Sequence, residues 1–254
     1  MITIKKKQLF FTLTEKWFGY KFKWSDLFLP VCYRGLRESD QQFYFGVKKY
    51  TKTVVLSLNE PVETIYANFF TSNKRDIKKA EAEGVQCFFS DEMKNFVEFY
   101  NEFAKNKKLD LLDPKRINEY AVKEWKCSSA VINGQLLVVH SYLEDQESGI
   151  VRSMQSGSLR LNENYNPRQI AQANKLLHYH DILYFKERGL KFYDFGGWDE
   201  MPGLLEFKQS FGGKPINIFN FFTYAYEIKE KVKESILSIR KKKQVFFKTK
   251  QSGS

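Results

Sequence analysis

The chain has 254 residues, of which 43% are hydrophobic, 28% charged and 17% aromatic. This length suffices for one substantial core, and the composition is that of a globular protein. No run approaches the roughly 18 apolar residues that a membrane span requires. Lys5, Lys6 and Lys7 stand where a signal peptide has its apolar stretch. We therefore expect a cytoplasmic protein with no membrane span.

The formal net charge is +11, which raises the question of nucleic-acid binding. Residues 229–250 contain nine Lys or Arg and two Glu, so this segment alone accounts for +7. A basic chain end is more typical of a solvated tail than of a specific binding surface. We therefore do not expect nucleic acid as a partner.

The chain has three widely spaced cysteines, Cys32, Cys87 and Cys127. An odd number argues against a disulfide framework, and the spacing fits no zinc site. The sequence also lacks the Walker loop, the GxSxG elbow and the GxGxxG fingerprint. It therefore gives no support to a metal site, to covalent hydrolysis or to nucleotide-dependent phosphoryl transfer.

The first sixty residues mix β-branched and aromatic residues, which favours strands. We expect these strands over residues 8–13, 42–47 and 53–58. A first helix begins near Pro61, because proline is tolerated in the first turn of a helix. Two further helices are predicted over residues 71–85, where Gly84 provides the helix end, and over residues 91–105, where apolar residues recur at helical spacing.

The apolar pattern changes its period in the middle of the chain. Asn133-Gly134 is a strong signal for a β-hairpin, and Pro167 and Gly189 fit the start and the end of a long helix. The expected elements of this region are strands over residues 129–133, 135–144, 150–161 and 191–195 and a helix over residues 167–188. This order indicates a mixed sheet with a crossover helix.

Four segments carry a resemblance to a known family. They read KRDIKKAEAEGV at residues 74–85, ANKLLHYHDI at 173–182, YDFGGW at 193–198 and FKQSFGG at 207–213. In this order they resemble the Fem-type peptidyltransferases and their shorter relatives in the N-acetyltransferase (GNAT) superfamily. The resemblance covers residues 74–213 and leaves out the first seventy residues and the basic tail.

The resemblance implies an α/β fold, with a GNAT-like mixed central β-sheet and helices on both faces. We expect a single GNAT-like domain over residues 1–228 with a strand-rich N-terminal extension, and a basic C-terminal helix or tail over residues 229–254. In such a fold acyl-CoA, the thioester of coenzyme A, enters a notch between two splayed central strands, here expected at residues 135–144 and 150–161. Unpaired backbone N–H groups at the splay would polarise the thioester carbonyl.

The pyrophosphate of coenzyme A is expected at the N-terminus of the helix that begins at Pro167, where free N–H groups and the helix dipole favour anions. The candidate cofactor-binding residues are Arg160, Arg168, Gln169, Ile170 and Asn174. The glycine-bearing pyrophosphate loop of the GNAT family is missing, because residues 160–170 contain no glycine. Arg160 and Arg168 are therefore either the phosphate contacts or ordinary surface arginines.

Two residues are candidates for a catalytic role. Alternation places His140 and Tyr142 on one strand face, where His140 either accepts the amine proton or is a hydrogen-bonded histidine within the sheet. Asp194 ends a strand just before Gly196 and Gly197. Its carboxylate either receives the amine or caps the turn that the two glycines make.

The candidate substrate-binding residues are Lys74, Arg75, Tyr142, Trp198, Asp199 and Lys208. The basic ones would meet phosphates of the acceptor, and the tryptophan would stack on a sugar or a base. The alternatives are solvated charges and a core tryptophan. On the long helix, Asn174, His178 and Asp181 recur at i, i+4 and i+7 and form a polar stripe.

We interpret the chain as an N-acyltransferase that moves a short acyl group from acyl-CoA to a primary amine. The preferred acceptor is a nucleotide-linked amino sugar for bacterial surface polysaccharide, and the amine would attack without a covalent enzyme intermediate. Two alternatives stay open. Full-length Fem-type enzymes carry two GNAT units and take amino acids from tRNA, so the donor would be an aminoacyl-tRNA; a catalytically inactive GNAT-like module would instead bind a ligand in the same pocket.

Overall fold

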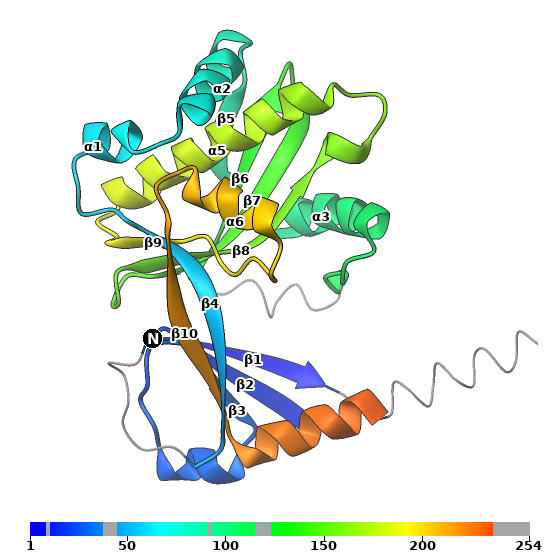
Figure 1. The fold of residues 1–254 in the computed structure, drawn as a ribbon. Coiled ribbons are helices and arrows are strands. Elements are labelled where there is room, and N and C mark those ends of the chain that lie inside the picture. Colours follow the sequence, from blue (N-terminus) through cyan, green and yellow to red (C-terminus); the bar gives the residue numbers. More distant parts are fainter. Residues whose placement is uncertain (9–10, 38–44, 91–92, 115–122, 236–254) are drawn as a thin grey trace, which may run out of the picture. The chain divides into compact units, whose positions relative to one another are not determined.

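The computed structural model describes residues 1–8, 11–37, 45–90, 93–114 and 123–235 (Figure 1). The chain forms two compact units. Unit 1 comprises Met1, Thr3–Tyr50 and the part of the chain from Ile218 onward, and unit 2 comprises Ile2 and Thr51–Asn217. Two strands, β4 (Val47–Ser57) and β10 (Lys214–Phe222), have residues in both units.

Unit 2 contains a mixed sheet whose strands follow the order β4–β9–β8–β7–β6–β5. β8 and β9 run parallel, whereas the pairs β4–β9, β7–β8, β6–β7 and β5–β6 are antiparallel. The strands not yet delimited are β5 (Gln86–Ser90), β6 (Trp125–Ile132), β7 (Gln135–Asp145), β8 (Ile150–Ser158) and β9 (Phe192–Asp194). The expected mixed sheet is therefore confirmed.

The hairpin between β6 and β7 turns at Asn133 and Gly134. Their φ angles are +49° and +77°, so both residues have the left-handed conformation that a two-residue type I′ turn requires. Glycine adopts this conformation freely and asparagine tolerates it. The predicted hairpin is confirmed, and its turn brings Ile132 opposite Gln135.

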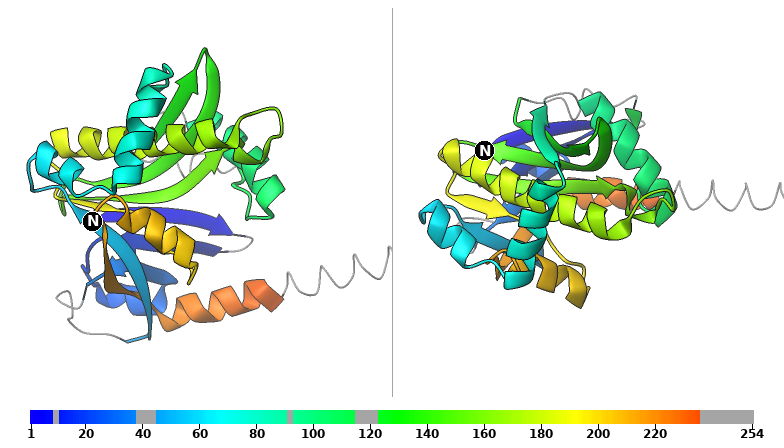
Figure 2. Two further views of the ribbon diagram at one scale, coloured as in Figure 1. Left: turned by 45° about the horizontal axis from the view of Figure 1, so that its top comes forward. Right: turned by 90° about the horizontal axis from the view of Figure 1, so that it is seen from above.

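The helices of unit 2 pack on the sheet and on one another. α5 (Pro167–Glu187) contacts β5, β6, β7 and β8, and α2 (Thr71–Ala82) lies beside α5 (Figures 1 and 2). α3 (Met93–Lys107) contacts β6, β7 and β8. The short helices α1 (Val62–Ala67) and α6 (Pro202–Gln209) precede α2 and β10 in the chain.

α5 and α3 cover opposite faces of the sheet. A Cβ atom on Gly157 of β8 would meet Cα of Tyr100 in α3 at 3.4 Å, and the register partner of Gly157 is Val139 of β7. The next residue of β7, His140, contacts Asn174 of α5. Because successive strand residues point to opposite faces, helices on both faces are confirmed.

α5 begins and ends where the sequence predicts. Pro167 occupies its first turn, and the side chain of Asn166 accepts a hydrogen bond from the backbone N–H of Arg168 at 3.0 Å, as an N-cap does. Gly189 follows the helix with a φ angle of +79°, which suits a left-handed helix end. The side of α5 that faces the sheet buries Ile170, Ala173 and other apolar residues in the main core of unit 2.

Most other predicted helices and strands agree with the structure to within about three residues, but some do not. The strand expected over residues 8–13 has the wrong bounds, because β1 (Ile2–Gln8) ends and β2 (Phe11–Trp17) begins there, and residues 9–10 lie outside the described part. Of the strand expected over residues 42–47, residues 42–44 also lie outside it and residues 45–46 are not in a strand; Val47 begins β4, which starts six residues before the strand expected over residues 53–58. Four elements were not predicted from the sequence: β1, β3 (Val31–Leu36), β5 and α6.

Unit 1 has the strand order β1–β2–β3–β10, with β2 and β3 parallel and β3 and β10 antiparallel. A turn of 3-10 helix, η1 (Trp24–Phe28), joins β2 to β3, and residues 224–235 form a helix after β10. Of the expected basic segment, residues 229–235 belong to this helix, and residues 236–254 lie outside the described residues. None of the described helices has both the length and the apolar character needed to cross a membrane.

Candidate active site

β8 and β9 pair over only three residues of each strand. The last pair in register is Arg152 with Asp194. Beyond it the chain stays with β4, since Phe195 N donates to Val54 O at 2.8 Å and Val54 N donates to Gly196 O at 3.3 Å. β8 meanwhile continues to Ser158 beside β7. We call the point where the β8–β9 pairing ends the strand divergence.

The expectation that residues 135–144 and 150–161 form the splayed pair is wrong. The strands at these residues, β7 and β8, stay paired from Val138 opposite Ser158 to Asp145 opposite Ile150, with one bulge between Ser141 and Tyr142. β7 and β8 stay paired because a short turn joins them, and a short turn keeps two antiparallel strands in register. β8 and β9 are instead joined through the crossover helix α5, and their pairing ends where β9 ends.

A buried polar cluster lies at the strand divergence and centres on Asp194. Its Oδ2 accepts a hydrogen bond from Arg152 Nη1 at 2.6 Å. Its Oδ1 accepts hydrogen bonds from Thr53 Oγ1 and from the backbone N–H of Gly196, the latter at 2.8 Å. Asp194 is buried, and the guanidinium of Arg152 also donates to Thr53 Oγ1 at 3.3 Å. Strands β4, β8 and β9 thus each contribute one side chain to the cluster.

Lys208 of α6 brings a second cation to the same place. Its Nζ donates to the carbonyl oxygens of Gly196, at 3.0 Å, and of Gly197. Only 8% of the residue is exposed. Burial disfavours the charged form and lowers the pKa of Lys208 to about 8, although the negative charge of Asp194 raises this pKa in part. Lys208 is therefore a buried ammonium that releases its proton more readily than an ordinary lysine.

Two glycines allow the close approach of these segments. Gly196 has a φ angle of +78°, a conformation that glycine adopts without strain. Gly213 follows α6, and a Cβ atom there would lie 2.6 Å from Val54 Cγ1 and 2.9 Å from Lys208 O. The YDFGGW and FKQSFGG segments therefore meet through backbone geometry that larger residues would disturb.

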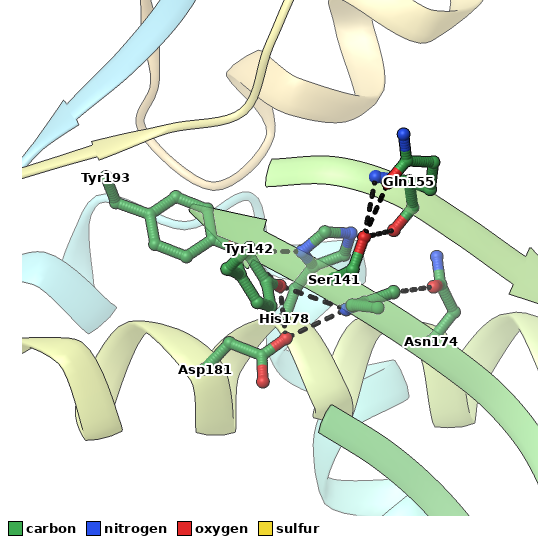
Figure 3. A network of polar contacts seen from close by, with 8 residues as sticks. Ser141, Tyr142, Gln155, Asn174, His178, Asp181 and Tyr193 are labelled. Carbon is green, nitrogen blue, oxygen red and sulfur yellow. Dashed lines mark hydrogen bonds and ion pairs between the residues drawn. The ribbon is translucent and has the colours of Figure 1, made fainter. Parts of the chain in front are cut away.

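A second polar network lies in the interior, between α5 and strands β7 and β9 (Figure 3). Asp181 Oδ2 accepts from Tyr142 OH at 2.5 Å and lies 2.8 Å from His140 Nδ1. Tyr142 OH lies 2.7 Å from Tyr193 OH, which in turn is 3.1 Å from His178 Nδ1. The network therefore joins two side chains of α5 to one strand on each side of β8.

His140 has an oxygen atom at each ring nitrogen. Besides Asp181 at Nδ1, Asn174 Oδ1 lies 2.8 Å from Nε2. Tyr142 OH also lies 3.1 Å from Nδ1, so both ring nitrogens of His140 are engaged within the network. Burial, reinforced by the neighbouring His140 and by Lys208, lowers the pKa of His178 well below its usual range, so His178 is neutral at pH 7. Burial and Asp181 raise the pKa of Tyr142 well above its usual range.

Among the described residues, His140, His178 and Asp181 form a group of possible metal ligands, with ligand atoms within 4.8 Å of one another. Their hydrogen bonds give another account of the group. The Asp181 oxygen that faces His140 also accepts from Tyr142, and His178 Nδ1 faces Tyr193. We therefore describe these side chains as a hydrogen-bonded network, and the expectation of no metal stays a prediction.

The structure brings some of the expected catalytic and substrate-binding residues together. Asp194 and Lys208 share Gly196 as a hydrogen-bond partner, and Asp194 caps the glycine turn. The loop after this turn carries Trp198, which packs against the main core, and Asp199, which is exposed.

The other expected residues lie elsewhere. His140 and Tyr142 are fully buried in the interior network. Lys74 and Arg75 are on α2, where Lys74 Nζ donates to Ala67 O at 2.6 Å and Arg75 is largely exposed. Thr53 and Arg152 donate hydrogen bonds to Asp194 but were not singled out from the sequence. Neither residue stands in a motif that would link it to Asp194.

The expected coenzyme A contacts flank the loop before α5. Arg160 and Arg168 are exposed, which leaves their guanidinium groups accessible. Gln169 Nε2 donates to Glu83 Oε2 at 3.1 Å, and Ile170 is buried in the main core. Asn174 contacts His140 in the interior network.

No family model and no curated protein matches the chain. Several solved structures do match. FemX has a TM-score of 0.60 at 13% identity, with 91% of this chain and 86% of FemX covered. The C-terminal DUF2156 domain of a candidate lysylphosphatidylglycerol synthetase from Agrobacterium fabrum has a TM-score of 0.59 at 8% identity, with 92% and 84% covered. L-PGS from Bacillus licheniformis has a TM-score of 0.54 at 12% identity, with 78% and 69% covered. At these identities the likeness concerns the fold alone, and the chain has the GNAT-like mixed α/β fold that its sequence predicts.

Proposed function

We propose that the chain is an N-acyltransferase that moves an acyl or aminoacyl group from an activated carrier to a primary amine at the strand divergence. The observation that carries this proposal is the pair of cations, Arg152 and Lys208, fixed beside the last paired residues of β8 and β9. Acyl transfer passes through a tetrahedral state with a negatively charged oxygen. Preorganised positive groups in a site shielded from water stabilise such a charge strongly.

In the proposed reaction the acceptor nitrogen attacks the carbonyl carbon of the donor. The new C–N bond forms as the carbonyl becomes an oxyanion, and the bond to the carrier oxygen or sulfur then breaks. The amine proton leaves with the carrier or to solvent, so no covalent enzyme intermediate is needed. Lys208 would stabilise the oxyanion, and alignment of the two substrates would contribute up to about 7–11 kcal/mol.

The two expected catalytic residues have positioning roles in this proposal. Asp194 already accepts three hydrogen bonds, and it fixes the guanidinium of Arg152 and the turn at Gly196. His140 is fully buried and faces Asp181 and Asn174, so it would act through the packing of α5 on β7. Neither residue needs to exchange a proton with the acceptor amine.

For the acceptor we propose a nucleotide-linked amino sugar. The guanidinium of Arg152 suits a phosphate, which arginine binds in a fork geometry. Trp198 and Asp199 lie on the adjoining loop, where an aromatic face and a carboxylate would contact a sugar. Lys74 and Arg75 stay in the proposal as outlying phosphate contacts.

For the donor we propose acyl-CoA, whose phosphates would meet Arg160 and Arg168. The backbone N–H of Arg168 already donates to Asn166, so the arginine side chains rather than the helix start would carry this contact. An aminoacyl-tRNA donor is the second candidate. The fold likeness to FemX and to L-PGS agrees with the Fem-type resemblance of the sequence, and it leaves the choice of donor to experiment. A ligand-binding module without turnover is the third candidate, and the glycine-free loop at residues 160–170 supports it.

A donor and acceptor panel tests the proposal. The purified chain is incubated with acetyl-CoA or with lysyl-tRNA or alanyl-tRNA, each with a set of nucleotide-linked amino sugars, and products are identified by mass spectrometry. Amide formation from either donor class supports transfer and tells the two donors apart. Thermal stabilisation by coenzyme A thioesters without product from any amine would favour the ligand-binding module. If the chain forms no product with any donor and acceptor and no ligand stabilises it, the proposal is contradicted.

A further inference from the structure

Unit 1 carries large apolar side chains that are exposed. Three belong to η1 and the residue after it, and three belong to the helix at residues 224–235. They are Trp24, Phe28, Leu29, Tyr224, Ile228 and Val232, which we call the apolar strip. Phe28 is 84% exposed and Ile228 is 62% exposed. Single exposed apolar residues are ordinary, but a group of six on two adjoining segments indicates an interaction surface.

The spacing of the helical members is regular. Tyr224, Ile228 and Val232 recur every four residues, so they form one stripe along the helix. Tyr226 of the same helix points into unit 1 and packs in a core cluster with Leu13. The helix is therefore anchored by one apolar side while the stripe remains exposed.

The two segments adjoin each other at Thr223. Its hydroxyl donates to Leu29 O at 2.7 Å and accepts from Val31 N at 3.1 Å. The helix therefore starts beside the end of η1, as the orange helix and the adjacent blue turn show in Figure 1. Both segments lie in unit 1, so the apolar strip is a feature of one compact unit.

Exposed lysines flank the apolar strip on both segments. Lys21 and Lys23 precede Trp24 and are exposed, and Lys231 is exposed next to Val232. Of the three acidic residues of the helix, Glu227 is ion-paired with Lys49 at 2.6 Å and Glu230 with Lys233 at 3.2 Å, and Glu234 is exposed. The sequence that follows is strongly basic, because residues 240–250 contain six Lys or Arg and no acid.

We propose that the apolar strip docks unit 1 on the surface of an anionic lipid bilayer. Aromatic and aliphatic side chains insert at the boundary between headgroups and acyl chains, and flanking lysines attract anionic headgroups. A second copy of the chain is a poorer fit, because a symmetric contact would bring the same lysines together. This inference goes beyond the proposed function, and its test needs no transfer activity.

Vesicle sedimentation of the full chain tests the inference. We expect the chain to sediment with vesicles that mix phosphatidylcholine and phosphatidylglycerol, more weakly with phosphatidylcholine alone, and less as salt is raised. Ile228→Asp and Phe28→Asp are each expected to weaken binding by about tenfold, since one large apolar side chain is withdrawn from the bilayer. Lys231→Glu is expected to weaken it by at least about fivefold, and only with the anionic vesicles.

Leu111→Asp is the matched control, because it introduces the same charge at an exposed apolar residue of unit 2. It should leave vesicle binding unchanged, and circular dichroism should show all variants folded. The inference is overturned if the wild type stays in the supernatant with anionic vesicles, or if Leu111→Asp weakens binding as much as Ile228→Asp. It is also overturned if Ile228→Asp abolishes a dimer in ultracentrifugation and leaves sedimentation with vesicles unchanged.

Discussion

Arg152 Nη1 lies 2.6 Å from Asp194 Oδ2, and these two residues are also the last register pair of β8 and β9. The ion pair thus sits where the backbone pairing of the two strands ends. Thr53 holds the other carboxylate oxygen from β4, and Gly196 N–H binds the same oxygen. One carboxylate therefore fixes the guanidinium and the turn that leads toward Lys208.

Asp194→Asn should weaken both stability and transfer. The variant keeps the shape of the side chain but removes the buried charge that balances the partly buried guanidinium of Arg152. Because breaking a buried ion pair leaves an uncompensated charge, we expect a loss of about 1–3 kcal/mol in the free energy of unfolding. Urea denaturation measures it. Asp199→Asn, on the exposed loop nearby, is the control and should stay within about 0.5 kcal/mol of wild type; an equal loss in both variants would contradict the role of Asp194.

The lowered pKa of Lys208 predicts a dependence of stability on pH. In the unfolded chain the lysine pKa is 10.5, whereas in the folded protein it is about 8. Between these values the unfolded state holds the proton and the folded state does not, so raising the pH through this window stabilises the fold. The free energy of unfolding of the wild type, relative to that of Lys208→Met, should rise by about 2–3 kcal/mol between pH 8 and pH 10.5. Below pH 8 the difference between the two proteins should be constant. Denaturation at several pH values measures this, and a flat difference throughout would refute it.

Asp181→Ala should destabilise the protein through the interior network. The change removes the acceptor of Tyr142 and the partner of His140, and both remain buried. We expect a loss of about 2–4 kcal/mol. Asp76→Ala is the comparison. It breaks a partly exposed ion pair, in which Lys175 Nζ lies 2.7 Å from Asp76 Oδ2, and should lower the free energy of unfolding by less than about 1 kcal/mol. Thermal and urea unfolding measure the stability of both variants, and an equal loss of stability in the two would disprove the prediction.

Gly213→Ala should disturb the contact between β4 and α6. The new Cβ atom would stand 2.6 Å from Val54 Cγ1 and 2.9 Å from Lys208 O, too close for either to remain in place. We expect a loss of about 1–3 kcal/mol from overpacking. Gly203→Ala in α6 has open space around its Cβ and should be neutral or slightly stabilising. Both variants add one methyl group, so similar unfolding midpoints would count against close packing at Gly213.

Much of the fold of unit 2 could be predicted because its signals are local. Pro167 and Gly189 delimit α5, and Asn133-Gly134 gives the β6–β7 turn. β1 was missed because three consecutive lysines in its sequence, ITIKKKQ, interrupt the alternation of apolar and polar residues that indicates a strand. α6 was missed because a helix of eight residues is too short for its apolar period to show.

The candidate site could be predicted only in part, for a related reason. Asp194 and Lys208 stand in segments whose glycines draw attention to them. Arg152 and Thr53 lie 42 and 141 residues from Asp194 in the chain, so only the strand order brings them to it. The sequence showed Asn174, His178 and Asp181 as a polar stripe without indicating a buried network, because the burial of the stripe against β7 depends on the packing of α5.

The most direct test of the account is the transfer rate of Lys208→Met against that of Lys214→Met. Both variants remove one lysine from unit 2, but Lys208 is buried at the strand divergence whereas Lys214 is exposed. With the donor and acceptor found in the panel, we predict that kcat/KM falls by about 10²–10³ in Lys208→Met, as for loss of one group that stabilises an oxyanion, while Lys214→Met stays near wild type. A folded Lys208→Met protein that transfers at the wild-type rate would contradict the assignment of the active site to the strand divergence.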